Sequence, residues 1–284
     1  MAELAYILGL TQAELKVVLY NYLREKNMSP MFEDGFVYAE GDIPVLLVAH
    51  MDTVFDEPPK NLYYDKKNDE LFSYEGGIGG DDRCGVYAIM KILERFKPHV
   101  LFTEDEEIGG VGAEKTVHKL PKPDVKYIIE FDRKGNNDCV FYDCGNEDFA
   151  KYIESFGFVT NYGSFSDISV LGPAWDIAAV NISSGYYNEH TKNEYIKFSE
   201  LQVIIKRIKN MIKNYENAKS FDFKEIIYSP SIYGNIFEDW TEEDFINWYN
   251  TFVVNDYFNK EENNKKLTLT KNDNNNYKKG DKIW

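Results

Sequence analysis

Apolar residues recur at two different spacings along this chain, and segments of the two kinds alternate. The stretch LTQAELKVVLYNYLREKN is expected to be helical, because Thr11 and Glu14 make a capping-box pattern at its start. Apolar side chains return at helical spacing in two further segments, at Val86, Ile89, Met90 and Leu93 and at Leu201, Ile204, Ile205 and Ile208. Short apolar runs typical of strands lie between the helical segments, among them IPVLLVAH and YIIEFD.

This alternation predicts the fold class and the domain organisation. Strands that alternate with helices of this length favour an α/β layer fold with a mixed, mostly parallel central sheet flanked by helices. A helix near 199–217 would close the sheet, so the main domain is predicted to span residues 1–218. Residues 219–284 are expected to form an extension with a short acidic, aromatic helix from Thr241 and a polar, loosely ordered tail. We find no internal repeat.

The charge of the chain narrows the range of partners. With 32 Lys and Arg residues against 48 Asp and Glu residues, the formal net charge is -16. A nucleic acid or an anionic membrane would repel such a chain at long range, so we expect neither as a partner. The excess of acids also promotes solubility, and that alone is sufficient to explain it.

The sequence also indicates where the protein is located and what its cysteines do. No apolar stretch approaches the roughly 20 residues of a membrane span, and MAELAYILGLTQAEL lacks the basic start and the small-residue cleavage site of a signal peptide. We therefore expect a cytoplasmic protein. The three cysteines, Cys84, Cys139 and Cys144, are odd in number and form no CxxC pair, which favours reduced thiols over a disulfide framework or a thiolate zinc site.

Acidic residues and histidines follow the apolar runs in a regular order. Each group lies at or just after a run, in the segments IPVLLVAHMD, GGIGGDDRCG, HVLFTEDEEIGG, YIIEFD and AAVNISSGYYNEH. Ligands of open α/β sheets gather at the carboxyl ends of the strands, so these side chains are expected to cluster there. The residues are His50, Asp52, Asp81, Asp82, Glu106, Glu107, Asp132 and His190. Such a set is what a site for two metal ions around a catalytic carboxylate requires.

The first two motifs each have a structural explanation as well. His50 and Asp52 point to the same side of a strand, where Asp52 can hydrogen-bond the imidazole and make it a better metal ligand. The same pair can equally have a structural or surface role. One of the adjacent acids Asp81 and Asp82 could bridge two cations with its two oxygens, or the pair could cap the helix that follows at Gly85.

The later motifs are open to two interpretations in the same way. The acids of TEDEEIGG would usually form a solvated loop, but here they lie between the apolar run VLF and a turn of small residues. In the pair Glu106 and Glu107, one could bind metal while the other stays free as a proton acceptor. Asp132 lies at another strand end, whereas a lone histidine such as His190 is more often incidental. The ordered set is a far stronger signal for a metal site than any single member.

Five of these segments resemble the motifs of a known enzyme superfamily. AHMDTV, GGDDRCG, TEDEEIGGVGA, EFD and the His190 region are similar to the motifs of zinc-dependent exopeptidases, which include tripeptidase T-like, leucyl aminopeptidase-like and glutamate carboxypeptidase-like enzymes. The resemblance covers roughly residues 40–195 and implies a zinc-exopeptidase-like fold. Many members insert a lid domain of about 100 residues between the fourth and fifth motifs. The interval from Asp132 to His190 is too short for one, so the chain resembles the single-domain form.

The resemblance implies a role for each motif residue. The implied metal ligands form two sets that share Asp81 as the bridge: His50, Asp81 and Asp132, and Asp81, Glu107 and His190. Glu106 would be the general base, and Asp52 would orient His50. The peptide bond between Asp81 and Asp82 is expected to be unusual, since it is often cis in this superfamily. Ligands of this kind suit two Zn²⁺ ions per chain, although Co²⁺ or Mn²⁺ could replace them.

The expected activity is hydrolysis of an amide bond in a short peptide. We expect an aminopeptidase, because acids beside the ligands could bind a free ammonium group: Asp82, Glu104, Asp105 and Glu189. A deacylase or a carboxypeptidase is the nearest alternative, with Arg83 or Lys192 as the cation for a substrate carboxylate, and an inactive metal-binding interaction protein is another. Tyr186 or Tyr187 could donate a hydrogen bond to the developing oxyanion, or could simply pack in the core. The sequence leaves the oligomeric state open.

Overall fold

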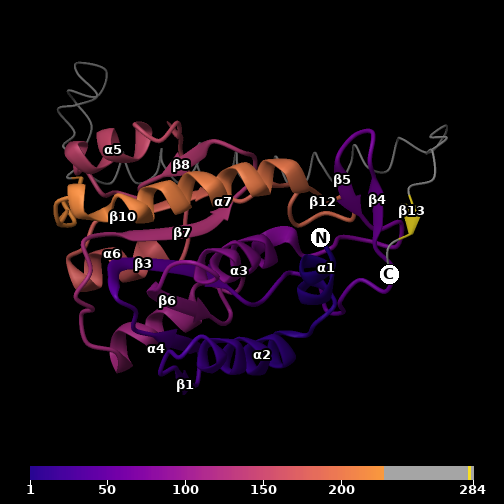
Figure 1. The fold of residues 1–284 in the computed structure, drawn as a ribbon, viewed down its shortest axis with the longest axis horizontal. Coiled ribbons are helices and arrows are strands. Elements are labelled where there is room, and N and C mark those ends of the chain that lie inside the picture. Colours follow the sequence, from indigo (N-terminus) through magenta and orange to yellow (C-terminus); the bar gives the residue numbers. More distant parts are fainter. Residues whose placement is uncertain (227–280, 283–284) are drawn as a thin grey trace, which may run out of the picture. The chain divides into compact units, whose positions relative to one another are not determined.

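A computed structural model describes residues 1–226 and 281–282, and its main feature is a sheet of eight strands (Figure 1). The strand order is β1-β2-β6-β3-β7-β10-β8-β9. These strands are β1 (Met31–Glu33), β2 (Phe36–Ala39), β3 (Ile43–His50), β6 (Pro98–Thr103), β7 (Ile128–Arg133), β8 (Asp138–Val140), β9 (Val159–Thr160) and β10 (Ala179–Ser183). The four central strands, β6, β3, β7 and β10, run parallel, and β2 and β8 flank them in the opposite direction. The predicted mixed, mostly parallel sheet is confirmed.

Helices cover both faces of this sheet, and the strands are apolar on both sides as a result. The helices are α1 (Ala2–Leu8), α2 (Gln12–Glu25), α3 (Gly80–Leu93), α4 (Val111–Lys119), α5 (Glu147–Glu154), α6 (Ile168–Trp175) and α7 (Phe198–Lys213). Helices α4 and α6 pack on one face, and the others pack on the opposite face. In β3, Leu46 and Val48 point toward α4 and α6 while Leu47 and Ala49 join the other core, as the two-residue period of a strand requires.

The elements expected from the apolar pattern are present. The capping box of α2 is confirmed, since the Thr11 hydroxyl accepts from Glu14 N and the Glu14 carboxylate accepts from Thr11 N. The helix predicted near 199–217 is α7, followed by the short 3-10 helix η1 (Tyr215–Asn217). All three cysteines are buried and form no disulfide.

A second, smaller sheet was not expected from the sequence. Its strand order is β11-β12-β5-β4-β13. The strands are β4 (Tyr63–Asp65), β5 (Glu70–Phe72), β11 (Tyr186–Tyr187), β12 (Tyr195–Lys197) and β13 (Asp281–Lys282). The expectation that all five motifs lie at strand ends is wrong for Asp81, which follows a glycine-rich turn instead. Asp81 lies in the first turn of α3, and His190 lies in the loop between β11 and β12.

The chain continues along the main sheet beyond residue 218. The Phe221 side chain is buried in the core, and its carbonyl accepts a hydrogen bond from Ala178 N. The helix predicted from Thr241 lies outside the described residues, as does the predicted tail apart from residues 281–282. Among the described helices, none is long and apolar enough to cross a membrane.

Candidate metal centre

The register of the parallel strands places three of the motifs at one edge of the sheet. His50 is the last residue of β3 and pairs with Thr103, the last residue of β6. Val48 pairs with Glu130 of β7, so Asp132, two residues further along, lies level with His50. Glu106 and Glu107 follow β6 after a short loop. The carboxyl ends of neighbouring parallel strands therefore bring these side chains together, as predicted.

The glycine-rich loop before α3 brings Asp81 to the same place. Gly79 has a φ of 69°, a conformation that residues with a Cβ rarely adopt. The peptide bond between Asp81 and Asp82 is cis, as the resemblance implied. The Asp82 carboxylate accepts a hydrogen bond from Gly85 N at 2.8 Å. Both interpretations of the acid pair therefore apply: Asp82 caps the helix, and Asp81 faces the cluster of acids and histidines.

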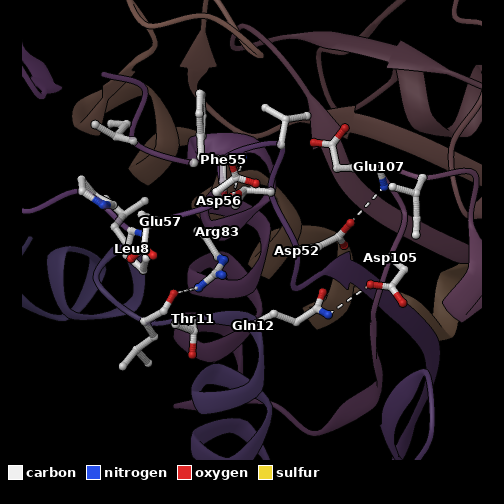
Figure 2. A pocket seen from close by; sticks show the side chains of 18 residues that line it. Leu8, Thr11, Gln12, Asp52, Phe55, Asp56, Glu57, Arg83, Asp105 and Glu107 are labelled. Atoms are coloured by element: carbon white, nitrogen blue, oxygen red, sulfur yellow. Dashed lines mark hydrogen bonds between the residues drawn. The ribbon is translucent and has the colours of Figure 1, made fainter. Parts of the chain in front are cut away.

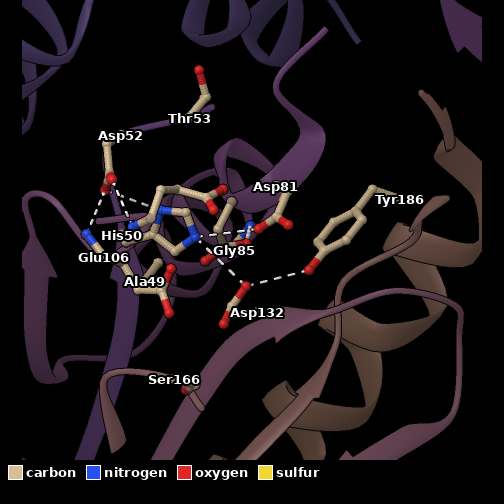
Figure 3. Close-up of polar contacts among 12 residues, drawn as sticks. Ala49, His50, Asp52, Thr53, Asp81, Gly85, Glu106, Asp132, Ser166 and Tyr186 are labelled. Atoms are coloured by element: carbon tan, nitrogen blue, oxygen red, sulfur yellow. Dashed lines mark hydrogen bonds and ion pairs between the residues drawn. The ribbon is translucent and has the colours of Figure 1, made fainter. Parts of the chain in front are cut away.

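The Asp81 carboxylate lies between the two histidines of the cluster. Figure 3 shows its contact with His50. Its Oδ1 is 3.2 Å from His50 Nε2, and its Oδ2 is 3.1 Å from His190 Nε2. Burial alone would raise the pKa of Asp81, but its hydrogen bonds with His190 and His50 hold the pKa below the ordinary value. One carboxylate thus presents a different oxygen to each imidazole, which is the arrangement that a bridging ligand requires.

Asp52 fixes both the His50 ring and the loop that carries the two glutamates. Its Oδ1 is 3.1 Å from His50 Nδ1, and its two oxygens also accept from Glu106 N and Glu107 N at 3.1 and 3.0 Å. Burial opposes protonation of the His50 ring, but the charge of Asp52 and the contacts with Asp132, Asp52 and Asp81 together outweigh burial and raise the pKa of His50 well above its ordinary value. With Nδ1 directed at Asp52, Nε2 of the fully buried His50 faces the acids.

Asp132 completes the environment of His50. Its Oδ1 is 3.5 Å from His50 Nε2 and accepts from the Tyr186 hydroxyl at 3.3 Å, while its Oδ2 accepts from Asn181 Nδ2 at 3.1 Å. Burial and the nearby charge of Asp81 raise the pKa of Asp132 to about 7. This carboxylate is therefore held in one orientation by two neutral donors, close to another acid that repels it.

The two glutamates of the TEDEE motif have different surroundings. Both Glu107 oxygens lie 3.0 Å from His190 Nε2. Hydrogen bonds with Asp81 and Glu107 raise the pKa of His190 to about 11. The Glu106 carboxylate takes part in no hydrogen bond or ion pair with the described residues. Burial, and next the charge of Asp132, raise its pKa to about 9.

The donor set fits metal cations. Ligand atoms of His50, Asp81 and Asp132 lie within 4.8 Å of one another, and so do those of Asp81, Glu107 and His190. These are the two ligand sets that the resemblance implied. A third group of the same size joins His50 with both glutamates. Each set combines imidazole nitrogens with carboxylate oxygens, the ligands that zinc accepts. Buried carboxylates crowded together repel one another, and cations between them would offset that repulsion.

The four acids expected to bind an ammonium group beside the ligands are already buried or paired, so this expectation is wrong for them as free groups. Asp82 is fully buried. Glu104 accepts from Lys16 Nζ at 2.6 Å, Asp105 accepts from Gln12 Nε2 at 3.1 Å, and Glu189 accepts from Lys134 Nζ at 2.6 Å. Their positions in the sequence do not show that these acids are paired, because their partners come from distant segments.

Of the two basic residues considered for a substrate carboxylate, one is bound to backbone carbonyls and the other is exposed. Arg83 Nη1 donates to the carbonyls of Ile7 and Leu10 at 3.0 Å each. These carbonyls lie at the end of α1, where a cation is favourable. Arg83 is therefore a helix-capping residue, and burial lowers its pKa to about 10. Lys192 is exposed in the loop after His190.

The two tyrosines before His190 differ in their contacts. Tyr186 is buried with its hydroxyl on Asp132. The Tyr187 hydroxyl donates to Glu200, and its ring stacks on Tyr195 with the two centroids 5.2 Å apart. Tyr186 thus belongs to the cluster, whereas the Tyr187 hydroxyl is directed to a residue outside it.

Sequence reasoning missed a residue that shapes the cluster. Glu194 is only 1% exposed. Its carboxylate accepts from the backbone N–H groups of Ile78, Gly79 and Asp81 at 2.9, 2.7 and 3.1 Å. Glu194 therefore holds the loop that presents Asp81. Its position four residues after His190 carries no signal of this role, because the partners are backbone groups more than 100 residues away.

Other missed residues support Asp132 and the strands beneath it. The Asn181 side chain accepts from Asp132 N at 2.7 Å and donates to Asp132 O and Oδ2. Two further acids, Glu130 and Asp167, are fully buried behind the cluster, where they accept from Ser166 and Thr103. An isolated polar residue in an apolar run was the only available signal for Glu130 and Asn181.

Comparison of the sequence with protein-family models and with curated proteins gives no match. Comparison of the fold with solved structures gives several. A tripeptidase from Staphylococcus aureus matches with a TM-score of 0.62 at 13% identity, over 75% of this chain and 97% of that one. Aminopeptidase PepT from Bacillus cereus matches with a TM-score of 0.59 at 14% identity, over 76% of this chain and 97% of that one. An aminopeptidase from the archaeon Desulfurococcus kamchatkensis matches with a TM-score of 0.58 at 15% identity, over 80% of this chain and 98% of that one.

These identities are low, so the similarity concerns the path of the chain and not the side chains that define an activity. The alternation of strands and helices, the mixed sheet and the cluster at its carboxyl edge are the features described above. The chain therefore has the fold of the tripeptidases and aminopeptidases to which it is similar, and the expected resemblance to zinc-dependent exopeptidases is confirmed at the level of the fold.

Proposed function

We propose that this protein is a di-metal peptidase that removes residues from the free amino terminus of short peptides. The observation that carries the proposal is the Asp81 carboxylate, whose two oxygens face His50 and His190 at 3.2 and 3.1 Å. A buried acid placed between two imidazoles, with a further carboxylate beside each, suits two cations that share one ligand.

In this proposal His50, Asp81 and Asp132 hold one Zn²⁺ ion, and Asp81, Glu107 and His190 hold the other. Bound zinc would polarise the scissile carbonyl and lower the pKa of a water molecule. Asp52 keeps the His50 ring in one tautomer and orientation through the 3.1 Å contact at Nδ1. Glu194 holds the loop from Ile78 to Asp81 through hydrogen bonds with its backbone, and so fixes the position of the bridging Asp81 carboxylate.

Glu106 is proposed as the group that moves the proton. It lies next to Glu107, and its carboxylate has no partner among the described residues, so it remains available to a water molecule. It would take a proton from the attacking water and return it to the leaving amine. Cations nearby favour the ionised form of an acid, so they would bring the pKa of Glu106 down from about 9 toward the working range of a base.

The surroundings of the cluster support an aminopeptidase over a carboxypeptidase. A carboxypeptidase must pair a substrate carboxylate with a cation. Arg83 is already bound to backbone carbonyls, and Lys134 is paired with Glu189 at 2.6 Å. Of the two cations considered from the sequence, this leaves only Lys192, which is exposed and fixed by no hydrogen bond or ion pair with a described residue. The structural neighbours named as aminopeptidases and as a tripeptidase agree with this choice. A cytoplasmic location remains a prediction.

Hydrolysis of matched tripeptides tests the proposal. The zinc-reconstituted protein is incubated with Leu-Gly-Gly, with its N-acetyl form and with its C-terminal amide, and the free amino acid released is measured. We expect the free and amidated peptides to release leucine, and N-acetylation to abolish or sharply reduce release, because an acylated amine carries no positive charge. Cleavage of the acetylated peptide together with dependence on a free carboxylate would assign a carboxypeptidase or deacylase instead. No cleavage of any of the three would contradict the peptidase proposal.

A further inference from the structure

A recess of about 510 Å³ opens beside the metal centre. It lies between the loop after β3, the loop that carries Glu107 and the junction of α1 and α2 (Figure 2). Asp52 and Glu107 belong both to its wall and to the cluster described above. A group bound in the recess would therefore lie next to any substrate held at the metal centre.

One part of the recess wall is apolar. Leu8, Leu10, Phe55 and Ile78 line it, together with two consecutive prolines at positions 58 and 59. The Leu8 and Ile78 side chains are fixed in the core, and Phe55 packs over Gly77, where a Cβ would come within 1.9 Å of the ring. A wall of this kind suits the aliphatic part of a side chain.

The rest of the lining is acidic. Besides Asp52 and Glu107, it contains Asp56, Glu57 and Asp105. Asp56 and Glu57 are exposed, and neither has a hydrogen bond or an ion pair with another described residue. Gln12 adds a further acceptor, since its Oε1 is buried without a donor in the described part of the chain. Five carboxylates thus surround a space that contains one basic residue.

That basic residue, Arg83, does little to offset the acids. Only 4% of Arg83 is exposed, and its Nη1 is committed to the carbonyls of Ile7 and Leu10. The exposed acids Asp56 and Glu57 would repel an anionic ligand from this part of the recess. A cation with an aliphatic stem has complementary surfaces at both ends, because the stem can lie along the apolar wall while the charge stays near the acids.

We propose that the recess binds a basic side chain, lysine or arginine, of the peptide substrate, with Asp56 and Glu57 binding its positive charge. This inference rests on the proposed peptidase function for its biological meaning. Its physical basis is separate, because the recess, its apolar wall and its unpaired acids do not depend on turnover.

The binding of two amino-acid amides tests the assignment without requiring catalysis. L-Lysinamide and L-norleucinamide have the same α-amine and stems of similar length, but only lysinamide carries a charged side chain. Their affinities are measured by calorimetry at low ionic strength on the zinc-loaded protein carrying Glu106→Gln, here and in the variants below, so that an active peptidase does not hydrolyse the amides. We expect lysinamide to bind about five- to tenfold more tightly, the scale of two partly exposed ion pairs, and the difference to shrink in high salt.

Two double variants with the same change of net charge locate the effect. In Asp56→Asn/Glu57→Gln the two amides should bind with equal affinity. In Asp124→Asn/Glu216→Gln, which removes two exposed acids outside the recess, the preference for lysinamide should be unchanged. Equal affinities in the protein that retains Asp56 and Glu57, absence of binding, or a preference that survives loss of these two acids would overturn the proposal.

The outcomes separate this inference from the proposed function. A protein that prefers lysinamide but cleaves none of the three tripeptides contradicts the peptidase assignment and supports the recess. A protein that cleaves the tripeptides but binds both amides equally contradicts only the recess.

Discussion

Glu106 and Glu107 are neighbours in the chain, but their carboxylates have different surroundings. We therefore expect substitutions of the two residues to have different effects. The Glu107 carboxylate lies 3.0 Å from His190 Nε2, whereas the Glu106 carboxylate has no partner in the described structure. Glu106→Gln should keep both metal ions and lower turnover by roughly a hundredfold or more, the scale for loss of a general base. Glu107→Gln should instead weaken zinc binding. Metal analysis and steady-state kinetics on both variants check this, and the reverse pattern would mean that the two roles are exchanged.

The ionisable residues of the cluster predict how stability depends on pH when no metal is bound. The pKa of Asp132 is raised to about 7 and that of Glu106 to about 9, and the pKa of His190 is raised to about 11. A group with a raised pKa in the folded state binds more protons there than in the unfolded chain, so its contribution to stability is lost as the pH rises through the raised value. Asp81 has a lowered pKa, and its contribution changes only in more acidic solution.

The three raised pKa values therefore all lower the stability of the folded protein as the pH rises from about 5 to 9. The melting temperature of the metal-free protein should fall steadily over that range, and saturating Zn²⁺ should flatten the profile because cations favour the ionised acids. Thermal unfolding followed by circular dichroism, with and without zinc, measures both curves. A metal-free profile that rises toward pH 9 would show that these acids are not crowded as described.

At the scale of elements, the glycine-rich loop before α3 depends on a partner from the loop before β12. Glu194 accepts hydrogen bonds from three N–H groups of that loop, including Asp81 N, and is not itself a proposed metal ligand. Glu194→Ala should lower zinc affinity by about tenfold to a hundredfold, the effect of removing a residue that orients a ligand. The matched control is Glu216→Ala, at an exposed position, which should leave the affinity unchanged. Equal affinities in the two variants would show that the loop holds its shape without Glu194.

Elements long enough to show a period could be predicted, and shorter ones could not. Helix α2 and the apolar strand β3 carry a capping box and a continuous apolar run. The strands of the second sheet have two or three residues each, which is less than one alternation needs to be recognised. His190 lies between two of these short strands, so the sequence shows an apolar run before it but not the small sheet that bounds its loop.

At the scale of the whole molecule, the order of the motifs was sufficient to predict which side chains meet. His50, Asp81, Asp132 and His190 are spread over 141 residues. The ends of parallel strands bring His50 and Asp132 together, while the start of α3 and the loop between β11 and β12 add Asp81 and His190. The acids of the rim could not be judged in the same way. Whether an acid is free depends on partners such as Lys16 and Lys134, and contacts of this kind across the sheet leave no local pattern in a single sequence.

The central claim is a pair of metal ions bridged by one carboxylate, and the zinc content of an Asp81 variant tests it most directly. The unaltered protein, dialysed to equilibrium against a small excess of Zn²⁺, should contain two zinc ions per chain by elemental analysis. Asp81→Ala should lose both, since each site lacks a ligand. Asp82→Asn should keep both, because Asp82 only caps α3 through Gly85 N. Circular dichroism confirms that each variant is folded. Two zinc ions retained by folded Asp81→Ala would contradict the bridged site.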